Sequence, residues 1–319
     1  MKGGINLKYY LNRLLRSALT LIIVITLAFL LMRMMPIEGY FGGDYDKLDE
    51  SQIQAKLENL GLLEPWYIQL ENFYSSLLKG DFGKSITYRP KVSVASIIGS
   101  KFIVSLKFGL SSLALSLVFG LGLGILMARF KGGIWDKFGT CYVVAANAVP
   151  VVIYYLLIQI FVTQWFHLPL LFEKDNSSSW ILPVICLSIV STAYYAMWIR
   201  RYMVDELNKD YVKLARAKGL KNKSIMVKHI MRNAFVPMAQ YLPASILYTI
   251  SGSIYVESLF SIPGTGGLLV TAIQRQDNPL VQSLVLVYSS IGIIGLLLGD
   301  ILMASFDPRI KLHSEGGSR

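Results

Sequence analysis

Long apolar stretches without a charged residue dominate the chain. A helix needs about 20 apolar residues to cross the hydrocarbon core of a membrane, and one charge at its centre costs about 3 kcal/mol. Six stretches approach or exceed that length, so the pattern predicts an all-α polytopic membrane protein with six transmembrane helices. These stretches cover residues 17–32, 108–128, 138–166, 176–199, 233–256 and 278–299.

The first apolar stretch follows a basic segment, as in a signal peptide, but it is too long for one and no small-residue cleavage site ends it. We expect it to remain in the chain as a helix over 14–36, with Arg33 snorkelling outward at its end. Pro150 and Pro237 lie inside the third and fifth stretches, which predicts kinked, cavity-lining helices. The glycines at 120, 122 and 124 offer a small face for packing within the chain or against a second subunit.

The segments between the stretches alternate in net charge. Residues 1–16, 129–137 and 200–232 are net positive, whereas 36–99, 167–175 and 257–277 are net negative. Because positive loops stay in the cytoplasm, this alternation predicts that both termini are cytoplasmic. The predicted organisation is a cytoplasmic N-terminus (1–16), the first transmembrane helix (14–36), an extracytoplasmic loop (37–99), a five-helix transmembrane domain (100–306) with a cytoplasmic loop at 200–233, and a cytoplasmic tail (307–319).

Composition agrees with a membrane protein and offers little chemistry. The chain is 54% hydrophobic and 16% charged, with a mean hydropathy of +0.50. Its net charge of +11 is concentrated in short loops beside the apolar stretches, so it indicates membrane orientation rather than nucleic-acid binding. Two cysteines and three scattered histidines form no metal-binding spacing, and no catalytic motif is present. We therefore expect a transport subunit, not an enzyme, with no metal and no cofactor in this chain.

The basic segment between the fourth and fifth stretches has the pattern of two helices joined by a tight turn. Good helix formers run from 205 to 218, with an apolar set at Tyr211, Leu214 and Ala215. Gly219 then stands where a left-handed residue closes a helix, and Asn222 or Ser224 is expected to start the next one. The small residues 215 and 219 would let another surface approach the backbone. A basic amphipathic helix lying on anionic lipid is the alternative reading of this segment.

The order of motifs resembles a known family. Ala-Arg-Ala-Lys-Gly-Leu at 215–220, followed by His229 and Arg-Asn-Ala at 232–234, resembles the ATPase-coupling loop of ABC-importer permeases of the first-subunit type in the oligopeptide, dipeptide and nickel family. Lys213 and Leu214 stand where the general Glu-Ala-Ala motif has its Glu and first Ala. Further matching segments lie at 10–15, 80–85, 257–266 and 307–309, so the resemblance covers the whole chain.

The resemblance implies an ABC type I importer-like permease in a bacterial plasma membrane. Its implied partners are a second homologous permease, two ATPase subunits that bind ATP and Mg, an extracytoplasmic substrate-binding protein or lipoprotein, the lipid bilayer and a peptide substrate. The residues it assigns to the ATPase-coupling loop are Tyr211, Leu214, Ala215, Ala217, Gly219, Leu220, His229, Arg232 and Asn233.

Two further groups of residues are candidates for the transport route. Kinks and polar side chains within the spans predict a translocation path lined by Asn147, Pro150, Gln159, Tyr248 and Ser251. At the predicted outer mouth, an outer gate or a contact with the binding protein is expected at Glu257, Pro263, Gly264, Arg275 and Asp277. The alternative for the charged members of the second group is that they are solvated loop charges.

The substrate stays open at this stage. Oligopeptides or dipeptides are the leading expectation, and nickel or haem importers share this subunit type. A self-sufficient secondary transporter would need charges near the middle of its spans, which this sequence lacks. A membrane-embedded enzyme or scaffold is disfavoured by the missing catalytic motifs.

Overall fold

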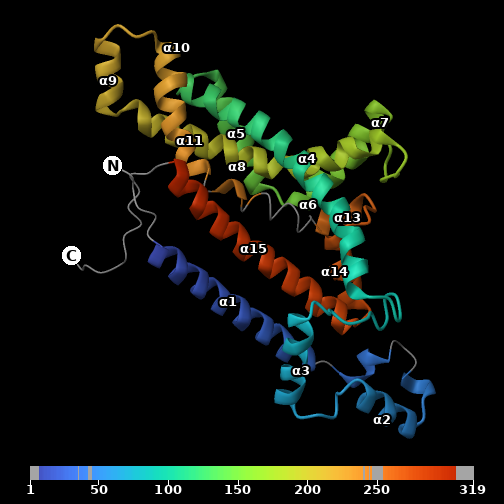
Figure 1. The fold of residues 1–319 in the computed structure, drawn as a ribbon. Helices are drawn as coiled ribbons and strands as arrows, with labels where there is room; N and C mark the ends of the chain where they lie inside the picture. Colours follow the sequence, from blue (N-terminus) through green and yellow to red (C-terminus); the bar gives the residue numbers. More distant parts are fainter. Residues whose placement is uncertain are drawn as a thin grey trace.

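Long helices form the frame of the protein in the computed structural model, which describes residues 7–34, 36–41, 45–239, 241–243, 245 and 254–306. Within these ranges the chain is helical and has no strand; Lys84 and Ser93 form an isolated bridge. Four helices are long and apolar enough to cross a membrane (Figure 1): α1 (Leu7–Arg33), α4 (Val94–Arg129), α8 (Ile181–Leu207) and α15 (Asn278–Phe306).

The third predicted span is broken, as the sequence predicts. Helix α5 (Ile134–Ala148) is followed by Val149 in an extended conformation, and α6 (Val151–Leu157) starts after Pro150. Proline has no N–H to donate and forces the preceding residue into an extended conformation, here ψ 131° at Val149. The second arm continues through η3 (Ile158–Val162) and α7 (Thr163–Phe166), and the two arms meet at 107°. Counted as one span, the pair raises the number of apolar spans to five.

Only parts of the fifth predicted span lie within the described residues. Helix α11 (Arg232–Ala239) covers its start, and its last residues begin α13 (Ile254–Leu259). Most of residues 240–253 lie outside the described ranges, including Tyr248 and Ser251.

Close packing of α4 on α8 forms the centre of the molecule. A Cβ atom on Gly124 would lie 2.2 Å from Ile199 Cγ2 and 2.4 Å from the carbonyl oxygen of Ala196. A Cβ on Gly120 would lie 2.8 Å from the carbonyl oxygen of Thr192. Both glycines therefore serve packing inside the chain, whereas a Cβ on Gly122 would meet nothing within 4 Å.

The segment between α1 and α4 folds back onto α1. It contains η1 (Ile37–Tyr40), η2 (Tyr45–Lys47), α2 (Glu50–Asn59) and α3 (Trp66–Leu78). In α3 the hydroxyl of Tyr74 lies 2.6 Å from the hydroxyl of Thr26 and donates to the carbonyl oxygen of Ile22 at 3.2 Å. Helix α3 thus lies beside the last third of α1, and α2 lies beyond it (Figure 1).

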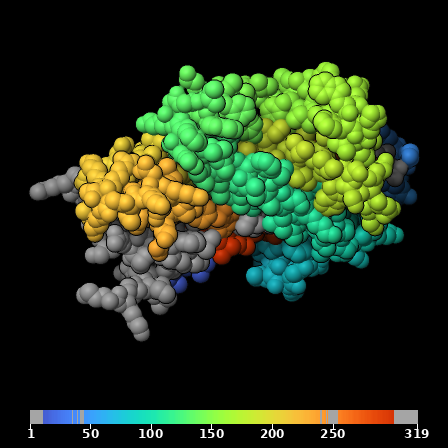
Figure 2. Space-filling view, turned by 90° about the horizontal axis from the view of Figure 1, so that it is seen from above, coloured from blue at the N-terminus to red at the C-terminus, as the bar shows by residue number. Residues whose placement is uncertain are grey.

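The remaining short helices lie at opposite ends of the frame. Helices α9 (Asp210–Ala217) and α10 (Asn222–Ser224) stand at the end away from α2 and α3, whereas α14 (Thr265–Gln274) packs near the start of α15 (Figure 1). The orange and yellow surface of residues around 210–235 forms one edge of the molecule in the second view (Figure 2).

Candidate functional site

The coupling loop, residues 200–233, is a direct extension of α8. This helix ends at Leu207, and α9 begins at Asp210 after a short turn, so the single helix expected over 205–218 is in fact two. Helix α10 then leads into η5 (Ile225–Met231), a π-helical segment, and on into α11. Lys221, not Asn222 or Ser224, occupies the N-cap position of α10.

Gly219 closes α9 as predicted. Its φ of +74° is left-handed, and two backbone hydrogen bonds complete the turn: Gly219 N–H to Arg216 C=O at 2.9 Å and Leu220 N–H to Ala215 C=O at 3.2 Å. This pattern is a Schellman motif, which glycine favours because it has no Cβ. A Cβ built on Gly219 would meet no atom within 4 Å, so the turn is open on its outer side.

The inner face of the loop has its own small core. Val212, Ala215, Ile225, Ile230 and Ala234 are buried against one another and against the end of α8. The expectation that Ala215 admits another surface is therefore wrong, because this side chain is only 7% exposed and is used inside the chain.

The expected apolar set of the first helix is also shifted in register. The sequence predicts Tyr211, Leu214 and Ala215 as one apolar set, but Leu214 is 56% exposed and Val212 is buried in its place. Tyr211 is half-buried. The exposed members of the coupling loop are Leu214, Ala217, Gly219, Leu220, Arg232 and Asn233, whereas His229 is half-buried.

Glu206, at the end of α8, connects three parts of the loop and was missed by the sequence reasoning. The hydroxyl of Tyr211 donates to its carboxylate, and Asn233 Nδ2 donates to the same oxygen at 3.4 Å. Burial, together with the hydrogen bond to Glu206, raises the pKa of Tyr211 to about 12, so the phenol stays protonated as a donor at neutral pH. Glu206 thereby ties α9 and α11 to α8.

A second connection joins α8 to the broken span. Arg200 donates to both oxygens of Asp136, from Nε at 2.5 Å and from Nη2 at 2.9 Å. The backbone N–H of Gly132 also donates to Asp136 at 2.8 Å. The carboxylate is buried at the start of α5, so this bidentate pair fixes α5 to α8 at the first residue of the coupling loop.

The candidates for the translocation path are not brought together in the described residues. Asn147 and Pro150 are exposed at the break between α5 and α6, where Asn147 Nδ2 donates to the carbonyl of Val143. Gln159 is 7% exposed, and its Nε2 donates to the carbonyl oxygens of Leu170 and Leu259, both at 3.0 Å. It thus holds α13 and the segment after α7 in place rather than facing an open cavity.

Glu257 is buried, which excludes its reading as a solvated loop charge. It is 3% exposed and accepts hydrogen bonds from Ser105 Oγ at 2.6 Å and from the N–H groups of Gly266 and Gly267 at 2.7 and 3.1 Å. Burial raises its pKa, although these hydrogen bonds oppose the rise. A Cβ on Gly264 would lie 2.3 Å from this carboxylate, so the glycine leaves room for a carboxylate that caps α14.

Asp277 is the corresponding group after α14, and it is fully buried. Its carboxylate accepts from the hydroxyl of Ser85 and from the backbone N–H groups of residues 86–88, at 2.5–3.2 Å. Neither Glu257 nor Asp277 is on the surface of the chain. The exposed members of the outer group are Pro263 and Arg275, whose guanidinium lies 5.6 Å from the ring centroid of Tyr88.

Known proteins resemble this chain over nearly its full length. The model of the family described as "Binding-protein-dependent transport system inner membrane component" matches residues 120–312. The dipeptide transport system permease protein DppB of Lactococcus lactis subsp. cremoris (strain MG1363) is 32% identical over 305 residues, covering 96% of this chain and 99% of that protein. The glutathione transport system permease protein GsiC of Escherichia coli (strain K12) is 33% identical over 312 residues, with the same two shares.

A solved structure is also similar. A chain described as "Crystal structure of an amino acid ABC transporter with histidines" aligns with a TM-score of 0.49 and 18% identity, covering 68% of this chain and 95% of that one. The family match spans more than half of the chain, and the relatives exceed 30% identity over almost all of it. The chain therefore belongs to the inner membrane components of binding-protein-dependent transport systems, among the peptide and dipeptide ABC permeases.

Proposed function

We propose that this permease subunit carries peptides of a few residues across a bacterial plasma membrane. In the proposed assembly it pairs with a second homologous permease, and an extracytoplasmic substrate-binding protein delivers the peptide. Two ATPase subunits bind ATP and Mg on the cytoplasmic side. The printed names of the relatives, a dipeptide and a glutathione permease, support a substrate of the peptide type. Six spans with both termini in the cytoplasm complete the proposal.

The observation that carries the coupling proposal is the open Gly219 turn on a loop that is fixed to α8. An incoming surface meets no Cβ at this turn, while the exposed Leu214 and Leu220 offer apolar contacts beside it. Glu206 ties the loop to α8, and the Asp136–Arg200 pair ties α8 to the broken span. A movement of the ATPase subunits would thus reach α8 and α5 through these hydrogen bonds and the ion pair rather than through a flexible connection.

The test compares two glycines that differ in position but not in local geometry. Gly219 and Gly80 both have positive φ, +74° and +73°, both close a helix with the same two backbone hydrogen bonds, and a Cβ on either would meet nothing within 4 Å. We expect Gly219→Trp to reach the membrane, lose its ATPase subunits on purification and lose ATP-dependent uptake, because the ring blocks docking. Gly80→Trp carries the same backbone strain and should keep most of its uptake.

Normal uptake by a well-inserted Gly219→Trp protein would contradict the docking proposal. Equal losses in both variants would show that strain in the turn, not docking, is responsible. Gly219→Asn separates these causes further, since asparagine tolerates the left-handed conformation and adds only a small side chain. We expect this variant to retain more uptake than Gly219→Trp.

The substrate class is tested by purifying the tagged chain from native membranes in mild detergent. Mass spectrometry should find a second permease and ATPase subunits. In a separate uptake assay, unlabelled di- and tripeptides should compete with the uptake of a radiolabelled peptide. If the chain instead purifies as a stable particle without partners, the result would favour a self-sufficient secondary transporter. Competition by nickel or haem, but not by peptides, would overturn the proposed substrate and leave the importer intact.

A further inference from the structure

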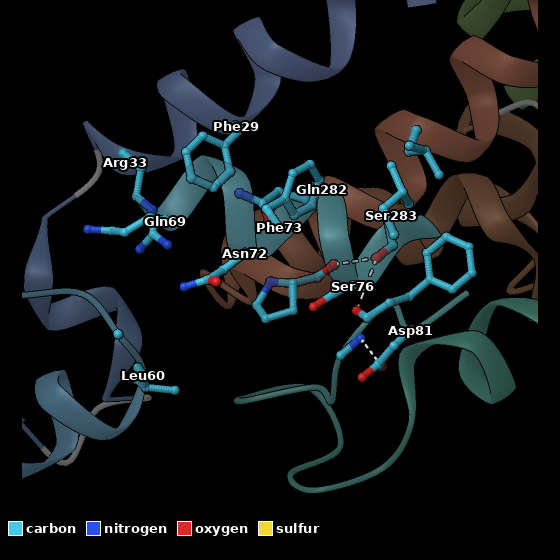
Figure 3. A pocket seen from close by; sticks show the side chains of 16 residues that line it. Phe29, Arg33, Leu60, Gln69, Asn72, Phe73, Ser76, Asp81, Gln282 and Ser283 are labelled. Carbon is cyan, nitrogen blue, oxygen red and sulfur yellow. Dashed lines mark hydrogen bonds between the residues drawn. The ribbon is translucent and has the colours of Figure 1, made fainter. Parts of the chain in front are cut away.

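A cavity of about 250 Å³ lies between the end of α1, α3 and the first turns of α15 (Figure 3). It is separate from the coupling loop and from the residues assigned to the translocation path. Its walls are mixed: aromatic rings and leucines alternate with amides, one cation and one carboxylate. None of the functional assignments made above uses it.

Arg33 turns into this cavity instead of snorkelling outward. Its guanidinium carbon lies 5.1 Å from the ring centroid of Phe29, a side chain that is itself 1% exposed. Nε of Arg33 is buried and has no hydrogen-bond partner, and no carboxylate of the described residues forms an ion pair with this arginine. A buried donor on a full positive charge is therefore left over, which is costly unless a ligand or water accepts from it.

Gln69 supplies the complementary group. Its Nε2 donates to the carbonyl oxygens of Leu62 at 3.2 Å and Glu64 at 2.5 Å, which fixes the orientation of the amide. Its Oε1 is buried and accepts no hydrogen bond. The cavity thus presents an unused donor and an unused acceptor, and its labelled view places Gln69 next to Arg33 (Figure 3). An occupant must contain both an acceptor, preferably anionic, and a donor.

Asp81 lies on the opposite side of the cavity from Arg33 in this view (Figure 3). One of its oxygens accepts from the N–H of Gly83 at 2.8 Å, which holds the carboxylate in position. Asp81 is exposed, and its second oxygen makes no hydrogen bond within the described part of the chain. A single cation and a single carboxylate at separate places favour a zwitterion over a simple anion.

The position of the cavity along the membrane-spanning helices indicates which class of zwitterion binds there. Arg33 is the last residue of α1, and the wall formed by Pro279, Ser283 and Leu286 belongs to the first turns of α15. The ends of two membrane-spanning helices lie at the level of the lipid headgroups. Phe29 of α1 and Leu286 of α15 line the same cavity, so apolar surface meets the polar groups at this depth.

We propose that this cavity binds the headgroup of a zwitterionic phospholipid of the phosphatidylethanolamine type. The phosphate accepts hydrogen bonds from the guanidinium of Arg33, because the planar fork of arginine N–H donors matches the oxygens of an oxyanion. The ammonium donates to the acceptors that remain, the amide oxygen of Gln69 and the carboxylate of Asp81. The acyl chains extend from the cavity into the hydrocarbon beside α1 and α15. Such a lipid would fill the space between α1, α3 and α15 and hold α3 against the frame.

The test uses the purified assembly that contains the full chain, stripped of lipid and then titrated with defined lipids. Native mass spectrometry measures how much phosphatidylethanolamine, phosphatidylglycerol or phosphatidylcholine each assembly retains. We expect phosphatidylethanolamine to be retained most strongly, and Arg33→Gln to weaken its apparent affinity about tenfold or more, as the loss of a charge-assisted contact implies. Asp81→Asn keeps the acceptor for Gly83 and should shift the preference from phosphatidylethanolamine to phosphatidylglycerol.

Arg129→Gln is the matched control. Arg129 also ends a membrane helix with its guanidinium 5.0 Å from a phenylalanine ring, that of Phe130, but it is exposed and outside the cavity. Equal lipid retention by Arg33→Gln and Arg129→Gln would overturn the proposal. So would displacement of the lipid by inorganic phosphate, by glycerophosphoethanolamine or by a dipeptide at comparable concentrations, because the site would then bind a soluble ligand.

A folding defect is distinguished by a second variant. Arg33→Lys keeps the charge over Phe29 but loses the planar fork, so it should bind more weakly than the wild type and more strongly than Arg33→Gln. Equal gel-filtration profiles for all variants would establish that assembly is intact. A graded loss across Lys and Gln supports headgroup binding, whereas full retention in both contradicts it.

Discussion

At the scale of single residues, the buried carboxylates have the largest structural effect. Asp277 satisfies one hydroxyl and three backbone N–H donors of residues 85–88. Its charge and position were visible in the sequence, but its partners lie about 190 residues away. No local pattern indicates such a contact, so the sequence predicts an outer gate, a contact with the binding protein or a solvated loop charge at this position. Gly219 is the opposite case, because a Schellman turn is closed by residues within five positions and local sequence predicts it.

The Asp277 site gives a stability prediction. Asp277→Ala leaves these donors buried without an acceptor and should lower the free energy of unfolding by about 3 kcal/mol or more. The measurement is thermal unfolding in detergent, followed by tryptophan fluorescence. Asp210→Ala is the control, since Asp210 is almost fully exposed and its pair with Lys213 contributes little. A similar melting temperature for both variants would contradict this role of Asp277 as the acceptor for residues 85–88.

At the scale of elements, apolar length and proline position predicted most of the helices. The four long spans and the break at Pro150 depend on short-range properties, so the sequence was sufficient for them. The two helices in place of one over 205–218 and the π-helical η5 were not predicted, because packing around Val212 and Ile225 decides where each segment bends. The glycines at 120, 122 and 124 indicate a small face on α4, but the sequence does not indicate that α8 packs on it, because that pairing depends on the packing of the whole chain.

The α4–α8 contact has its own test. Gly124→Ala places a methyl group 2.2 Å from Ile199 Cγ2 and against the backbone of α8, so the helices must separate. We expect destabilisation by about 1–3 kcal/mol, the usual cost of overpacking. Gly122→Ala, two residues away with nothing within 4 Å, should be neutral or slightly stabilising because alanine favours a helix. Equal melting temperatures for the two would show that α4 and α8 are not held at this distance.

At the scale of the whole molecule, two polar contacts connect the coupling loop to the broken span. Glu206 joins the loop to α8, and Arg200 joins α8 to Asp136 of α5. The sequence predicted the loop and the break separately, from charge and from proline. It did not predict their connection, because Asp136 and Arg200 are 64 residues apart and neither stands in a recognisable motif.

This connection predicts a variant that docks but does not transport. Arg200→Gln removes the bidentate pair while leaving Gly219 and its surroundings unchanged. We expect the ATPase subunits still to co-purify while peptide uptake falls about tenfold, within the usual range of coupling energies. Lys137→Gln, at an exposed site one residue after Asp136, should leave both unchanged. Loss of the ATPase subunits from Arg200→Gln would place the pair in docking rather than in transmission.

The contact of Asp277 with residues 85–88 also has a consequence for folding during synthesis. Synthesis reaches residues 85–88 early, but their acceptor follows only after about 190 further residues have entered the membrane. Until then the segment carries open backbone donors and lacks the contact that fixes it to α15. A nascent chain interrupted before residue 277 therefore keeps residues 85–88 without their acceptor, the kind of exposed backbone that proteases cut. Synthesis of α15 and closure of this site are thus linked, because the acceptor is the last residue before α15.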